Sequence, residues 1–126
     1  MRNLLRVADR DLGDARVEAV SVDTRFRLGY QAAFALATIV LAASGVRTTG
    51  VRHHVVTWQA LPELLGAEFQ DLTGYFDQVR SKRNVADYDR AFEIAEVELR
   101  ELIEEVRKFR PVVLAWLKKH HRSLQP

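Results

Sequence analysis

The sequence predicts an all-α fold, an up-and-down helical bundle of four to five helices that ends in a long C-terminal helix. Three observations lead to this expectation. Apolar residues recur at spacings of three, four and seven along most of the 126 residues. No segment shows the convincing apolar–polar alternation of a half-buried strand. The 6 glycines and 3 prolines are sparse, and we expect them near helix ends.

Length and composition limit the classes of protein to consider. A chain of 126 residues fits one domain, 1–126, with a core large enough to need no disulfide or metal. The absence of Cys excludes a disulfide framework, a thiolate zinc site and a cysteine nucleophile. A net charge of +2 gives no strong field to attract nucleic acid. The N-terminal segment does not read as a signal peptide, and a cytoplasmic location is the expectation.

The first two helices are expected over residues 4–20 and from about 22 to 44. Ser21 or Asp23 is a suitable N-cap for the second helix, and Gly45 is a suitable stop. Residues 32–43 are apolar on nearly every side. This stretch is too short for the roughly 20 residues of a membrane span, so it predicts a central core helix and no membrane contact.

The third and fourth helices are expected over about 52–65 and 67–86, separated by Gly66. Pro62 could split the third helix or open a new turn. On the fourth, an apolar stripe recurs every seven residues and is widened by two phenylalanines. Its members are Leu65, Leu72, Val79 and Ala86, with Phe69 and Phe76.

The fifth helix is expected from near Phe92 to His120, with a kink at Pro111 because proline removes a backbone donor. Its apolar residues keep helical spacing throughout. They are Phe92, Ala95, Leu99, Leu102, Ile103, Val106, Val113 and Leu117.

One polar constellation on the fourth helix has chemical content. Arg80, Arg83, Asn84, Asp87 and Tyr88 fall on one helical face, beside the apolar stripe. Guanidiniums are forked donors that suit a phosphate, and a tyrosine offers a hydroxyl and a surface for base stacking. The alternative is structural: Arg83 and Asp87 also form an ordinary i, i+4 pair of opposite charge, with the rest as solvated surface.

The segment from Arg83 to Asp89, with its Arg-Asn and Asp-Tyr, resembles the signature of HEPN domains (higher eukaryotes and prokaryotes nucleotide-binding). It is similar to a bacterial branch in which Asp-Tyr replaces the usual His. The apolar helix before residue 45, the pair His53-His54 and the long last helix resemble the same family. The resemblance covers about residues 20–118 and implies the HEPN bundle.

The resemblance also implies a function. Many HEPN domains are homodimers that bind or cut RNA without a metal or cofactor, and many are toxins silenced by an antitoxin or a nucleotidyltransferase-like partner. Arg83 would hold the scissile phosphate as a catalytic residue, and Tyr88 takes the place of the catalytic His. A phenol is a poor general base at neutral pH, so the departure weakens cleavage and leaves RNA or nucleotide binding open.

The remaining binding candidates come from the polar face of the fourth helix and from the resemblance to HEPN domains. Arg80, Asn84, Asp87, His53 and His54 are expected to contact RNA or a nucleotide. The two adjacent histidines point about 100° apart on a helix, which disfavours a shared metal. Two functions from different classes stay open: a HEPN-type RNA-binding domain, with endoribonuclease activity as its sharper form, and a non-catalytic helical dimerisation or interaction module.

Overall fold

The computed structural model describes residues 1–88 and 94–125, and the side chains of residues 84–88 lie outside this description. It confirms the all-α prediction, because helices account for most of the described chain and no described residue lies in a strand. The last helix is the longest of those described. The elements are α1 (Arg2–Ala15), α2 (Val22–Ala43), α3 (His53–Leu65), η1 (Ala67–Phe69), α4 (Gln70–Tyr88), α5 (Glu96–His120) and η2 (Arg122–Leu124).

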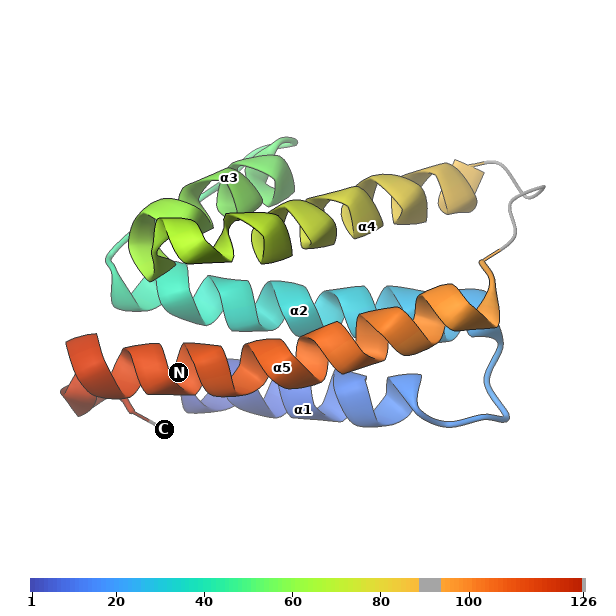
Figure 1. The fold of residues 1–126 in the computed structure, drawn as a ribbon, viewed down its shortest axis with the longest axis horizontal. Coiled ribbons are helices and arrows are strands. Elements are labelled where there is room, and N and C mark those ends of the chain that lie inside the picture. Colours follow the sequence, from blue (N-terminus) through green and yellow to red (C-terminus); the bar gives the residue numbers. More distant parts are fainter. Residues whose placement is uncertain (89–93, 126) are drawn as a thin grey trace.

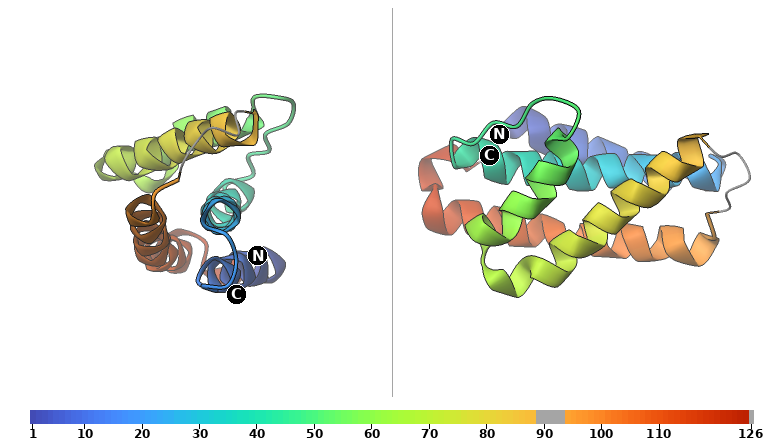
Figure 2. Two further views of the ribbon diagram at one scale, coloured as in Figure 1. Left: turned by 90° about the vertical axis from the view of Figure 1, so that its right-hand side faces the viewer. Right: turned by 90° about the horizontal axis from the view of Figure 1, so that it is seen from above.

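Helix α2 is the centre of the bundle, and the other helices are arranged around it (Figure 1). It packs against α1 and α5 on one side and against α3 and α4 on the other. Figure 2 shows α4 crossing obliquely over the layer that α2 and α5 form. Because α3 and α4 also pack on each other, the three helices α2, α3 and α4 all contact one another.

The core follows the predicted apolar stripes closely. From α4 it takes Phe76 and Val79, and from α2 it takes nearly every apolar residue between Phe26 and Leu41. Of the predicted α5 positions, those that the structure describes are buried where the spacing placed them, except that Ala95 is exposed and Ile103 is only half-buried. The buried α5 side chains are Leu99, Leu102, Val106, Phe109, Val113, Trp116 and Leu117.

Two glycines end helices as the sequence predicted. Gly45 follows α2 with φ of +74°, and Gly66 follows α3 with φ of +124°. Both values lie in a region that is open to glycine and costly for other residues. The end of α1 was predicted wrongly: it stops at Ala15, five residues early, where Arg25 Nε donates a 2.7 Å hydrogen bond to the Ala15 carbonyl.

Two prolines lie inside helices without ending them. Pro62 lies in the last turn of α3, which continues to Leu65, so the proline does not split the helix. Pro111 lies within α5, which runs on to His120. The start of α5 differs from the prediction, because the helix begins at Glu96; Phe92 lies outside the described residues.

Helix α2 is longer than its most apolar stretch. Among the described helices, this 22-residue helix alone is long and apolar enough by composition to cross a membrane, which corrects the sequence argument that the apolar stretch is too short. Yet 61% of its most apolar window is buried inside the bundle. Buried core helices pass the same test of length and composition, so the feature is weak evidence for a membrane span.

Candidate functional site

A chain of hydrogen bonds runs from the core to the surface through Tyr30 of α2. The indole Nε1 of Trp58 lies 3.1 Å from the Tyr30 hydroxyl, and that hydroxyl lies 2.7 Å from Nδ1 of His54. Trp58 and His54 both belong to α3, one turn apart, so the same helix contacts the hydroxyl twice. Tyr30 is fully buried, and His54 is partly exposed.

The chemistry of the indole fixes the direction of the first bond. An indole N–H can only donate, so the Tyr30 hydroxyl accepts from Trp58. In the neutral tautomer of His54 that is protonated on Nε2, the hydroxyl donates its proton to Nδ1. In that tautomer Nε2 of His54 is a hydrogen-bond donor at the outer end of the chain.

Burial and positive charge keep His54 neutral. Its pKa is lowered from 6.5 to about 4, chiefly by burial and then by the nearby His53, Arg83 and Arg80. Burial likewise raises the pKa of Tyr30 to about 12, opposed by the Trp58 hydrogen bond and the positive charge of Arg83. At neutral pH both groups therefore act as hydrogen-bonding groups without charge.

Two arginines of α4 reach the same place. The Arg83 guanidinium carbon lies 5.0 Å from the centroid of the Tyr30 ring, which is a cation–π distance. Arg80, one turn earlier, is held by Asp77 through a 2.7 Å hydrogen bond between Nε and Oδ1. This bond uses one of the five guanidinium N–H groups of Arg80 and fixes the orientation of the others.

Aromatic rings form the wall of this site. Phe34, one turn after Tyr30 on α2, stacks on His54 with 3.8 Å between ring centroids and 10° between planes. His53 meets the edge of Phe34 at 5.5 Å. We call the group of Tyr30, Phe34, His53, His54, Trp58, Asp77, Arg80 and Arg83 the tyrosine cluster.

The structure brings together four of the seven residues that the sequence singled out. Arg80, Arg83 and His54 surround Tyr30, and His53 adjoins them through Phe34. The other three are Asn84, Asp87 and Tyr88, whose backbone is helical but whose side chains lie outside the described residues. Their proposed roles, and the alternative ion pair of Arg83 with Asp87, remain predictions.

The sequence analysis missed the residue at the centre of the site. Tyr30 is a hydrogen-bonding ring just before the most apolar stretch of its helix, and Phe34 follows it at the i+4 position of the same face. A tyrosine buried in an alanine-rich helix needs a partner for its hydroxyl. That signal was available in the sequence and pointed towards a polar contact on this face.

Within the described part of the chain, no group of three His, Asp or Glu side chains is placed to hold a metal ion. The tyrosine cluster itself offers hydrogen-bonding groups and positive charge beside aromatic rings.

Comparison with known proteins adds no relative. No protein-family model, no curated protein and no solved structure matches the chain.

Proposed function

We propose that this domain binds RNA or nucleotide phosphate groups at the outer edge of the tyrosine cluster, as a HEPN-like helical domain. One observation carries the proposal: Arg80 and Arg83 of α4 and His54 of α3 lie near one buried tyrosine, Tyr30. Two guanidiniums and a neutral imidazole donor suit the oxygens of a phosphate group.

Pre-organisation supports the proposal. Arg80 is fixed by Asp77, and Arg83 packs on the face of Tyr30, so neither side chain must lose all of its freedom when it binds a phosphate. The neighbouring ring of Phe34 offers apolar aromatic surface beside the charges. Positive donors beside aromatic rings are the combination that single-stranded nucleic acids bind.

Binding is better supported than cleavage. A metal-free ribonuclease needs a group that takes the proton of the attacking 2′-hydroxyl. In the tyrosine cluster Nδ1 of His54 is engaged with the Tyr30 hydroxyl, and in the Nε2-protonated tautomer neither ring nitrogen is left to take a further proton. In this tautomer His54 is arranged as a hydrogen-bond donor to a phosphate oxygen. Endoribonuclease activity is the more specific form of the proposal and needs a test of its own.

The test of binding compares two arginines of equal charge. Fluorescence anisotropy with a labelled single-stranded RNA should show that Arg80→Gln weakens binding about tenfold, because a charge-assisted contact is lost. Arg107→Gln on α5 removes the same charge from an exposed ion pair with Glu104 and should change affinity less than about twofold. No binding by the parent protein, or equal losses in both variants, would contradict the proposal.

The test of cleavage uses total RNA and transfer RNA with the parent protein and Arg83→Ala. Cleavage that the parent shows and the variant loses would establish the nuclease form. Equal cleavage by both proteins, or none by either, would remove it and leave the binding proposal to the anisotropy experiment.

A second candidate function is a non-catalytic interaction module. The observation in its favour is the exposed apolar surface at the start of α3, where Val51 is fully exposed and Val56 is 42% exposed. Under this interpretation the contact of Arg83 with Tyr30 is structural. Arg83→Ala would then lower the melting temperature sharply, while the parent protein would show no affinity for RNA.

A further inference from the structure

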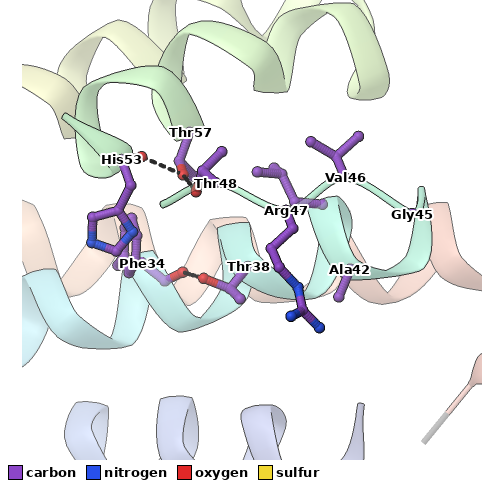
Figure 3. A pocket seen from close by; sticks show the side chains of 10 residues that line it. Phe34, Thr38, Ala42, Gly45, Val46, Arg47, Thr48, His53 and Thr57 are labelled. Atoms are coloured by element: carbon purple, nitrogen blue, oxygen red, sulfur yellow. Dashed lines mark hydrogen bonds between the residues drawn. The ribbon is translucent and has the colours of Figure 1, made fainter. Parts of the chain in front are cut away.

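A hollow lies next to the tyrosine cluster, on the same side of α2. Its volume is about 480 Å³, and it lies between the second half of α2, the loop after Gly45 and the first turns of α3 (Figure 3). Ligand pockets for small molecules commonly measure roughly 300–1,000 Å³. Phe34 and His53 belong to both the hollow and the tyrosine cluster, so the two are continuous.

The threonines of this hollow have a fixed hydrogen-bonding direction. Thr57 Oγ1 lies 2.7 Å from the His53 carbonyl, which can only accept, so the single proton of Thr57 goes there. Thr48 Oγ1 lies 3.1 Å from Thr57 Oγ1 and must then be the donor of that pair. Thr38 likewise donates to the Phe34 carbonyl at 2.8 Å.

A free hydroxyl can both donate and accept a hydrogen bond, but the threonine hydroxyls of this hollow can only accept one from a ligand. The hydroxyls of Thr38 and Thr48 both donate hydrogen bonds within the protein, and each oxygen keeps lone pairs that can accept a hydrogen bond from a ligand. Both side chains are partly exposed and line the hollow, from opposite walls. A ligand that donates two N–H groups from a flat edge matches this pair of acceptors.

The lining of the hollow also includes a positive charge and aromatic rings. Arg47 is exposed, and among the described residues no carboxylate is paired with it. In Figure 3 its side chain extends across α2 between Thr38 and Ala42, on the far side of Thr38 from His53 and Phe34. A guanidinium suits an anionic group, and the rings of Phe34 and His53 suit a flat heterocycle.

We propose that this hollow is a base-recognition subsite for a nucleotide with an exocyclic amino group. The amino edge of the base lies against Thr38 and Thr48, the ring lies against Phe34 and His53, and the phosphate meets Arg47. The inference rests on the proposed function, because it assigns to that RNA-binding site the nucleotide class it prefers. Adenosine 5′-monophosphate is the simplest probe.

The experiment first compares two ligands on the unmodified full chain. Titrations followed by ¹H–¹⁵N NMR use adenosine 5′-monophosphate and purine riboside 5′-monophosphate, which lacks only the amino group. The subsite predicts roughly 3- to 10-fold tighter binding of the first, from one or two neutral hydrogen bonds. The largest amide shifts should fall at Thr38, Thr48 and their neighbours in the loop after Gly45.

A matched set of variants locates the effect. Thr38→Val and Thr48→Val remove acceptor oxygens from the hollow and should abolish the preference between the two ligands. Thr73→Val on α4 is the control, since Thr73 also donates to its own helix, to the Gln70 carbonyl, but lines a different surface. It should keep the preference. Thr38→Val needs no loop rearrangement, which guards against misfolding of the Thr48 variant.

Three results would overturn the subsite. They are equal affinity for the two ligands, an unchanged preference in both hollow variants, and no shift with about 5 mM adenosine 5′-monophosphate. RNA binding that depends on Arg80 would survive any of these results, so the proposed function would stand without the subsite. Conversely, nucleotide binding in the hollow together with an Arg80 variant that binds RNA normally would overturn the proposed function alone.

Discussion

The two sides of α2 differ sharply in chemistry, although adjacent residues face them. Gly29 faces α5, where a Cβ in its place would lie 3.0 Å from a methyl carbon of Leu102. Tyr30, the next residue, turns its hydroxyl towards α3 and its ring towards α4. One side of the helix makes a close apolar contact with α5, and the other side makes hydrogen bonds and a cation–π contact with α3 and α4.

This difference teaches where stability and function lie in the bundle. Apolar burial gains free energy in proportion to area and has no preferred direction, so the α5 side can hold the fold together without any polar group. The α3–α4 side buries a hydroxyl and an indole N–H and must satisfy both. The cost of placing polar groups there is explained if that side binds a ligand. Four perturbations test the comparison.

The largest effect is expected on the apolar side. Leu102→Ala removes a fully buried side chain at the α2–α5 contact and should lower the free energy of unfolding by about 3 kcal/mol. Urea denaturation measures the loss. RNA affinity of the folded variant should stay unchanged, and a loss below about 1 kcal/mol would contradict the assignment of stability to this side.

The next effect is expected at the centre of the polar side. Tyr30→Phe keeps the ring but leaves the indole N–H of Trp58 buried and without its partner. Such a group costs about 1–3 kcal/mol of stability. Thermal and urea unfolding measure it, with Tyr75→Phe on α4 as a control that also removes one phenolic hydroxyl. An equal loss of unfolding free energy in the two variants would show that the hydrogen-bond chain at Tyr30 adds nothing to stability beyond one ordinary hydroxyl.

A smaller effect concerns pH. The folded pKa of His54 is about 4 and the ordinary value is 6.5, so between these pH values the unfolded chain binds a proton that the folded chain does not. The free energy of unfolding therefore falls as pH falls through this window, by roughly 1 kcal/mol for a side chain this exposed to solvent.

The control for this pH effect is His54→Gln, which cannot titrate. Carboxylates contribute to the pH dependence of both proteins, so the difference between the two curves isolates His54. Parallel curves from pH 7 to 4 would contradict the lowered pKa. A variant curve that falls less steeply than that of the parent is the expected result.

The smallest effect is expected at the surface pair that joins α1 to α5. Arg110 contacts both carboxylate oxygens of Asp9, at 2.7 and 3.0 Å, and this hydrogen bonding raises the pKa of Arg110. Exposed pairs contribute only about 0.2–1 kcal/mol. A double-mutant cycle with Asp9→Asn and Arg110→Gln should give a coupling in that range, and RNA binding should not respond.

The sequence allowed good prediction of what depends on local pattern. Helical periodicity located the described helices and most of the core, because the spacing of apolar residues is set by the geometry of a single helix. Gly45 and Gly66 ended helices for a local reason as well. The end of α1 was missed because Arg25, from the next helix, caps it through a tertiary contact.

The site was predictable only in part, for the same reason. Arg80 and Arg83 could be placed on one face of α4 from spacing alone. Their approach to Tyr30 and His54 depends on how α4 crosses α2 and α3, which no local pattern contains. The hydrogen bonds at Tyr30 join α2 to α3, so no pattern within one helix predicts them.

The most direct test of the account is the pKa of His54 with and without RNA. NMR titration of the His54 ring should give a midpoint near 4 in the free protein. A phosphate beside the ring favours the charged imidazolium, so bound RNA should raise the midpoint by about 1 unit or more. An unchanged midpoint in an RNA complex would contradict the claim that phosphate binds at the tyrosine cluster.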